Sequence, residues 1–219
     1  MPIKENLLHI KSQLPEPVTL VAVSKTKPVS DLMEAYQAGQ RIFGENKIQE
    51  MTEKWEQMPK DIQWHMIGHV QSNKVKYMAE YVNLIHGVDS LKLLQEINKQ
   101  AAKHNRVIDC LLQMYIAEEE SKFGLDASEL SEILNSAEFK AMQNIKVIGL
   151  MGMATFTDNQ IQIKKEFQNL KSIFDTSQTP TTNNYQPSTL SMGMSGDYKL
   201  AIECGSTMVR IGSSIFGGR

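Results

Sequence analysis

One stretch decides the fold: LVAVSKTKPVSDLMEAYQAG, residues 20–39. It begins with a short apolar run over residues 20–23, which is typical of a parallel strand buried on both faces. A polar loop follows, and residues 29–39 then place Leu32, Ala35 and Tyr36 on one side of a helix. The stretch therefore predicts a strand–loop–helix unit, the repeating element of parallel α/β folds.

The same unit repeats along the chain. Further short apolar runs cover residues 41–43, 63–67, 82–85, 108–114, 145–149, 188–192 and 207–211. Helical patterns with one apolar face cover residues 91–103 and 161–174. Right-handed crossovers between parallel strands either close the sheet or leave it open, and eight units predict closure into a single (β/α)₈ TIM barrel over residues 1–219. The polar stretch 176–188 is expected to be an exposed connection before the seventh strand.

Composition and charge exclude several classes of protein. Lys and Arg number 23 against 25 Asp and Glu, so the net charge of −2 favours neither nucleic acid nor an anionic membrane as partner. No apolar run approaches the roughly 18 residues of a spanning helix, and the N-terminus lacks a secretory signal. Cys110 and Cys204 lie outside any zinc-ligand spacing, and His65 and His69 have no glutamate between them, so no metal site is expected. We expect a cytoplasmic monomer.

Lys25 follows the first predicted strand. The working residues of barrels lie at the carboxyl ends of the strands, which places this side chain at the barrel mouth. Low dielectric and neighbouring cations can lower the pKa of a lysine there and make its amine a Schiff-base nucleophile. On position alone, solvated loop lysines are the more common alternative for Lys25 and Lys27, because lysine usually lies on the surface.

Two clusters of glycine and serine follow the seventh and eighth strands, over residues 191–197 and 210–214. Barrels frequently bind phosphate with these two loops. Gly212 lets the backbone approach a ligand, and the hydroxyls of Ser195 and Ser213 can donate to phosphate oxygens. Each cluster alone is compatible with a simple turn. Together with a strand-end lysine, they suit pyridoxal 5′-phosphate (PLP), which offers an aldehyde to the amine and a phosphate to the loops.

Several runs resemble those of a known family. They are VAVSKTKP, FGENKIQE, WHMIGHVQSNK, GLMGMAT, LSMGMSGD and GSTMVRIGSSIFG, and they are similar to runs of the YggS/PROSC family of pyridoxal phosphate homeostasis proteins. The resemblance covers nearly the whole chain. It implies a barrel similar to the N-terminal domain of alanine racemase, with PLP held as a Schiff base on Lys25. The other cofactor-binding positions that it implies are Asn46, Ser195, Arg210, Gly212 and Ser213. His69 lies in a signature run without an assigned contact.

Arg210 bears on the chemistry that the resemblance implies. It falls where related barrels place an arginine toward the pyridine nitrogen. A guanidinium is always charged and has no acceptor, so it disfavours a protonated ring and weakens the ring as an electron sink. Alternatively, Arg210 is a strand-end arginine paired with a carboxylate such as Glu203. Racemisation also needs a second acid or base, which alanine racemase takes from another domain; the sequence ends at Arg219, and we expect that half to be missing.

Three functions follow from these expectations. The first is a non-enzymatic protein of intracellular PLP homeostasis that buffers the cofactor and passes it to apo PLP-dependent enzymes. The second is a PLP-dependent amino-acid racemase of low activity. The third is a barrel that binds another phosphorylated metabolite. A second lysine, Lys27 or Lys47, is an alternative position for transient binding of the cofactor.

Overall fold

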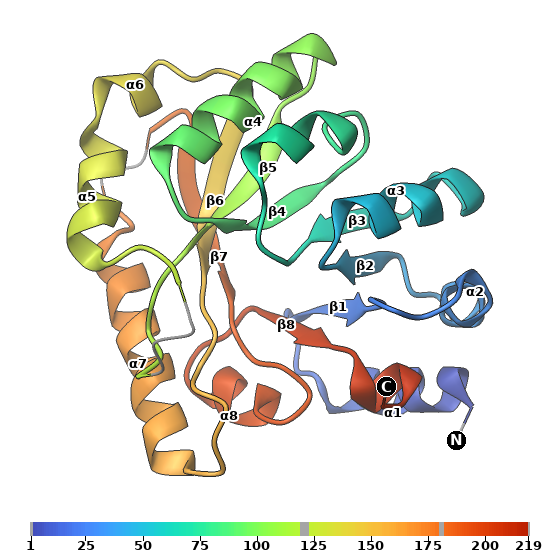
Figure 1. The fold of residues 1–219 in the computed structure, drawn as a ribbon. Helices are drawn as coiled ribbons and strands as arrows, with labels where there is room; N and C mark the ends of the chain where they lie inside the picture. The colour runs from blue at the N-terminus through green and yellow to red at the C-terminus, as the bar shows by residue number, and fades with distance from the viewer. Residues whose placement is uncertain (1, 119–122, 180–181, 219) are drawn as a thin grey trace.

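The computed structural model describes residues 2–118, 123–179 and 182–218, and their parallel strands close into a barrel (Figure 1). The strands are β1 Thr19–Val23, β2 Ile42–Glu45, β3 Gln63–Met66, β4 Leu84–Val88, β5 Ile108–Gln113, β6 Ile145–Met151, β7 Tyr185–Ser191 and β8 Met208–Ile211. Each strand pairs in parallel with the next, and β8 pairs with β1. The predicted TIM barrel is confirmed.

Helices surround the barrel on its outside (Figure 1). They are α1 Ile3–Gln13, α2 Val29–Gln37, α3 Ile48–Gln57, α4 Leu91–Lys103, α5 Ala127–Asn135, α6 Ala137–Lys140, α7 Gln160–Thr176, α8 Tyr198–Glu203 and α9 Ser213–Phe216, with a 3₁₀ turn at Ser72–Tyr77. The three helical patterns in the sequence correspond to α2, α4 and α7. Local capping defines several starts: the Ser90 hydroxyl accepts a bond from Leu93 N, and Asp126 forms a capping box with Glu129.

The core has two layers because successive strand residues point to opposite faces. The larger layer lies between strands and helices and includes Phe43, Trp64 and Phe167. The smaller layer fills the barrel interior, and its buried members are Val21, Leu84, Leu111, Met151 and Met208. Arg210 is two residues beyond Met208 on β8, so its side chain also enters the interior.

The expected exposed connection over residues 176–188 is wrong in part. Helix α7 extends to Thr176, and β7 begins at Tyr185, whose side chain is only 1% exposed. The Tyr185 hydroxyl donates to Ser177 Oγ at 2.8 Å, which satisfies its polar end. One buried aromatic anchors an otherwise polar segment, so the low apolar content of the stretch is misleading. Residues 180–181 lie outside the described residues.

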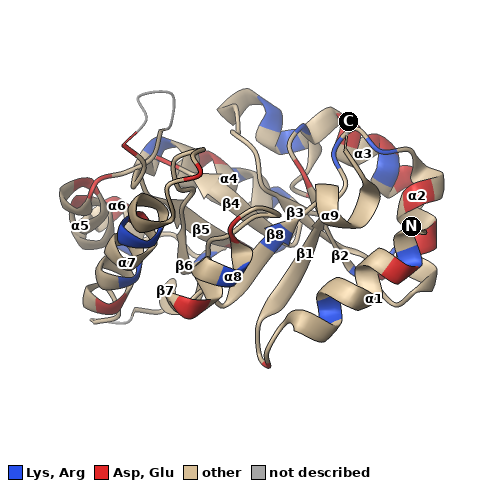
Figure 2. Ribbon diagram, turned by 90° about the horizontal axis from the view of Figure 1, so that it is seen from below, with Lys and Arg blue, Asp and Glu red and all other residues tan. Residues whose placement is uncertain are grey.

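Charged residues lie mainly on the outer helices. Lys and Arg are interspersed with Asp and Glu along helices such as α1, α3 and α7 (Figure 2). In the described part of the chain, no helix has the length and apolar character needed to cross a membrane.

Candidate functional site

A cavity of about 560 Å³, here called the strand-end cavity, opens where the barrel strands end. Its lining includes every site residue predicted from the sequence: Lys25, Asn46, Ser195, Arg210, Gly212 and Ser213. These residues come from β8 and from the segments after β1, β2, β7 and β8. The volume falls in the range of small-molecule sites. The structure thus brings together residues that are far apart in the chain.

The register of the strands gives these residues different depths. Arg210 pairs with Val21 in the middle of β1, whereas Lys25 and Gly212 follow the last residues of β1 and β8. The Arg210 side chain is buried, at 4% exposure, and Ser213 is exposed. Arg210 therefore forms the floor of the strand-end cavity, and the loop residues form its rim.

The Arg210 guanidinium is held by neutral groups. Its Nη1 donates to Ser191 O at 2.9 Å and to Ser191 Oγ at 2.6 Å, and its Nη2 donates to Gly152 O at 3.1 Å. These partners differ from the carboxylate of Glu203 that the sequence suggested as an alternative. Burial lowers the pKa of Arg210 to about 10, against the opposing effect of Asp197, so the group is still charged at neutral pH.

Two histidines continue this network through the barrel interior. Ser191 Oγ lies 3.1 Å from His86 Nδ1, and His86 Nε2 lies 3.1 Å from His65 Nδ1. Burial lowers the pKa of His65 to about 3 and that of His86 well below its usual value, so both rings are neutral. His69 lies outside, with Nδ1 3.7 Å from Asp89 Oδ2. His65 and His69, which are spaced i, i+4 in the sequence, therefore have different surroundings.

The loops after β7 and β8 meet at the rim. Gly212 N donates to Ser195 Oγ at 3.2 Å, so a backbone N–H and a hydroxyl lie side by side. Gly193 has φ +97°, and a Cβ there would lie 2.6 Å from the Ala201 Cβ, so the close turn requires glycine. Met194 N donates to Asp197 Oδ1 at 2.6 Å and closes the loop. Backbone N–H groups and hydroxyls are the donors with which proteins bind phosphate.

Lys25 lies in a tight turn at the end of β1. Lys27 N donates to Ser24 O at 3.1 Å, and Thr26 between them has φ +64°. The Lys27 side chain points elsewhere, because its Nζ donates to Gly218 O at 2.9 Å. Among the described residues, the lining of the strand-end cavity includes Lys25 but neither Lys27 nor Lys47.

Sequence reasoning missed part of the lining. The apolar part of the wall contains Val23, Ile67, Met153, Ala154, Phe156, Ile163 and Met194, and polar additions include Thr155 and Asp197. Thr155 follows β6, and Glu166 on α7 holds it: Glu166 Oε2 accepts from Thr155 N at 2.6 Å, and Oε1 accepts from Thr155 Oγ1 at 2.7 Å. The sequence does show Met153 and Met194 shortly after predicted strands. A methionine at such a position, however, usually only packs in the core.

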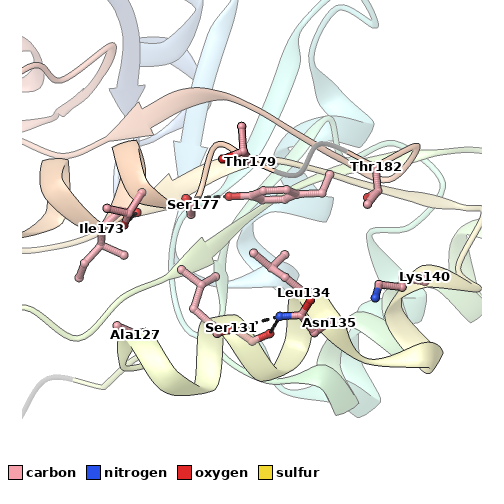
Figure 3. A pocket seen from close by; sticks show the side chains of 12 residues that line it. Ala127, Ser131, Leu134, Asn135, Lys140, Ile173, Ser177, Thr179 and Thr182 are labelled. Carbon is pink, nitrogen blue, oxygen red and sulfur yellow. Dashed lines mark hydrogen bonds between the residues drawn. The ribbon is translucent and has the colours of Figure 1, made fainter.

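A second, smaller cavity of about 280 Å³ lies between α5, the end of α7 and the start of β7 (Figure 3). Ser131 and Asn135 line one side, and Ser177 and Thr179 lie across from them. Lys140 is its basic residue. None of the predicted site residues lines it, and it lies near the amino end of β7, away from the carboxyl ends where barrel sites form.

Known proteins are similar to this chain in sequence and in fold. The family model for the alanine racemase N-terminal domain matches residues 2–219. A pyridoxal phosphate homeostasis protein from Vibrio alginolyticus is 40% identical and covers 99% of this chain and 97% of its own. The protein of the same name from Escherichia coli K12 is 37% identical over 94% of this chain and 87% of its own.

Solved structures extend the comparison. PipY of Synechococcus elongatus, solved with PLP bound, has a TM-score of 0.89 and 34% identity, covering 98% of this chain and 100% of its own. Alanine racemase from Clostridium difficile shares the fold, with a TM-score of 0.79 and 16% identity, and this chain spans 56% of its length. The resemblance seen in the sequence motifs is confirmed. The chain belongs to the family of the alanine racemase N-terminal domain, and within it to the pyridoxal phosphate homeostasis proteins.

Proposed function

We propose that this protein binds PLP in the strand-end cavity, holds it as a Schiff base on Lys25, and serves intracellular PLP homeostasis as a buffer and carrier. The observation that carries the proposal is the single cavity lined by Lys25, by the paired Ser195 and Gly212, and by Arg210 at its floor. The names of the relatives from Vibrio alginolyticus and Escherichia coli, and the PLP in PipY, support the same ligand.

The residues of the strand-end cavity fit PLP in their chemistry and in their depth within the cavity. PLP supplies an aldehyde, which condenses with a lysine amine with loss of water. Ser195 Oγ and the N–H groups of Gly212 and Ser213 would bind the phosphate at the rim. Arg210, held below them, would direct a donor toward the pyridine nitrogen, and Asn46 would lie beside the ring. The neutral His65–His86–Ser191 chain fixes the guanidinium without offering it a carboxylate.

The lining also favours a carrier over a racemase. Apart from Lys25 and Arg210, the titratable side chains among the described lining residues are Asp158 and Asp197. Asp158 is exposed, and Asp197 Oδ1 already accepts a bond from Met194 N on the phosphate side of the cavity. An efficient racemase needs a second acid or base poised across the substrate from the lysine. Neither aspartate is placed for that role.

The setting of the protein is part of the proposal. Cys110 and Cys204 are free and buried, which suits a reducing compartment, and we place the protein in the cytoplasm. We infer that it acts as a monomer and a single domain. Its partners are then PLP and apo PLP-dependent enzymes that receive the cofactor.

Borohydride labelling tests the proposal. PLP is added to the purified protein, the visible absorbance band is recorded, borohydride is added, and the labelled peptide is identified by mass spectrometry. The expected label is on Lys25, is lost in Lys25→Ala, and persists in the matched control Lys27→Ala. A label that follows Lys27 would contradict the assignment. If no residue were labelled, the one remaining interpretation would be a barrel that binds another phosphorylated metabolite.

Two assays of the loaded protein separate the carrier from the racemase. We expect the protein to activate an apo PLP-dependent enzyme in proportion to the PLP that it carries. We also expect no substantial exchange of the α-hydrogen of L-amino acids in deuterated water. Rapid exchange that Lys25→Ala abolishes would favour the racemase instead.

A further inference from the structure

A buried cluster of charges lies directly behind the lysine turn. It consists of Glu45 at the end of β2 and of Glu50 and Lys54 on α3. The side chains of Glu45 and Lys54 are 0% and 6% exposed, and that of Glu50 is 23% exposed. Lys54 Nζ lies 2.7 Å from Glu45 Oε1 and 2.7 Å from Glu50 Oε1. No step of the proposed function has used these three residues.

The cluster contacts the residues on both sides of Lys25. On one side, Ser24 Oγ donates to Glu45 Oε1 at 2.6 Å, and Lys54 Nζ donates to Ser24 O at 2.8 Å. On the other side, Thr26 N donates to Glu50 Oε1 at 2.6 Å. An ammonium has three donors, and the three partners of Lys54 account for all of them. The backbone before and after Lys25 is therefore fixed by one set of charges.

The conformation that the cluster holds is a costly one. Thr26 has φ +64°, in the left-handed region that β-branched residues rarely adopt. Such residues persist only where their surroundings impose them, and they gather at functional sites. The hydrogen bond from Thr26 N to Glu50 Oε1 is one of the contacts that impose this conformation, because it fixes the peptide between Lys25 and Thr26.

Stability alone does not explain the cluster. Glu45 Oε2 is buried and has no hydrogen-bond partner among the described residues. Burial raises the pKa of Glu45, although Lys54 and Ser24 oppose the shift. Buried ion pairs contribute little net stability, because desolvation of both charges offsets their attraction. A group that is costly to bury, and that bonds to the turn of the reactive lysine, points to a role in placing that lysine.

We propose that Glu45, Glu50 and Lys54 form a positioning cluster that holds the Ser24–Lys27 turn so that the Lys25 amine enters the strand-end cavity already oriented toward an aldehyde. This inference rests on the proposed function and deepens it. The cluster acts through the backbone of the turn and touches no ligand. It therefore governs how fast the covalent bond to PLP forms, and leaves the binding of the phosphate to Ser195 and Gly212 unchanged.

Two ligands separate these effects. PLP reports the covalent step through the rate at which the visible band appears. Pyridoxine 5′-phosphate lacks the aldehyde, so its affinity, measured by calorimetry, reports non-covalent binding alone. The first variant is Glu50→Ala, chosen because Glu50 is partly exposed and its loss leaves Lys54 paired with Glu45. Glu53→Ala on the solvent-exposed side of α3 is the matched control. Glu50→Gln restores an acceptor for Thr26 N.

The expected result is a rate for Glu50→Ala that falls on the order of tenfold, because small misplacements of a reacting group are costly. The affinity for pyridoxine 5′-phosphate should stay within about twofold, Glu53→Ala should behave like the wild type, and Glu50→Gln should recover most of the rate. Lys54→Met should show a larger loss if it folds. An unchanged rate in Glu50→Ala would overturn the inference.

Equal losses for both ligands would also overturn it, because they would show a general distortion of the cavity. Failure of the proposed function looks different from either outcome. In that case the wild type itself forms no band with PLP, and the positioning role falls together with the function on which it rests.

Discussion

Acidification should destabilise this protein through the two histidines inside the barrel. Burial lowers the pKa of His65 to about 3, and burial, with His65 and Arg210 adding to it, lowers the pKa of His86 well below its usual value. Unfolding returns each ring to a pKa of about 6.5. The unfolded state therefore binds more protons between these values, and the free energy of unfolding falls as the pH falls through this window.

The size of this stability loss follows from the pH range between the folded-state and unfolded-state pKa values. At about pH 5, an unfolded histidine is protonated and His65 in the fold is not, which costs about 2 kcal/mol of stability. The pKa of His86 is shifted in the same direction, mainly by burial, so His86 adds to this loss of stability in acid. Domains of this kind have only about 5–15 kcal/mol in total. The loss of stability between pH 8 and pH 5 should therefore be a large part of the total.

Urea unfolding at a series of pH values measures this loss of unfolding free energy in acid, with His65→Asn compared with the wild type. Asparagine can place a polar atom where His65 Nδ1 meets His86, and it does not titrate in this range. The variant should lose the part of the pH dependence that His65 contributes, whatever its absolute stability. Carboxylates contribute equally to both proteins and cancel in the comparison. Parallel curves for the two proteins between pH 8 and pH 5 would refute the reasoning.

Three further perturbations test the site and its supports. Ser195→Ala should weaken pyridoxine 5′-phosphate binding about tenfold in calorimetry, because a hydrogen bond to a charged phosphate is lost; unchanged affinity would place the phosphate elsewhere. Thr26→Asn should raise the free energy of unfolding by about 1 kcal/mol in urea titrations, because asparagine tolerates positive φ better; a decrease would contradict the strain at Thr26. Although burial raises it, the pKa of Glu166 is lowered overall by donors from Thr155, Gln162 and Glu118. The stabilisation that the Glu166 carboxylate contributes is therefore lost as the pH falls through this lowered pKa, and Glu166→Gln should cost about 1 kcal/mol at neutral pH and progressively less in acid; a constant difference would exclude this origin.

The barrel could be predicted from the sequence because its strands are buried on both faces and appear as apolar runs. The carboxyl-end rule of barrels then selected Lys25 and the Gly/Ser clusters, and family motifs added Asn46 and Arg210. All of these residues line one cavity. The structure agrees with the predicted location of these residues, because position along a strand determines position in space, and their cofactor-binding roles stay a prediction.

It failed where a polar residue is buried through partners distant in the chain. The predicted fourth strand ended at residue 85, but β4 continues to Val88 and carries His86 into the interior. A histidine and a glycine interrupt the apolar run, and the sequence does not show that Ser191 and His65 satisfy the ring. Lys54 is similar, because a lysine on a helix is expected in solvent until Glu45 and Ser24 are seen to surround it.

A crystal structure of the protein with PLP would test the central claim most directly. The account predicts continuous density between the cofactor and Lys25 Nζ, the phosphate at Ser195 Oγ and Gly212 N, and the pyridine nitrogen facing Arg210. PLP bound in the cavity beside Lys140, or phosphate density at the rim with the ring turned away from Arg210, would contradict it.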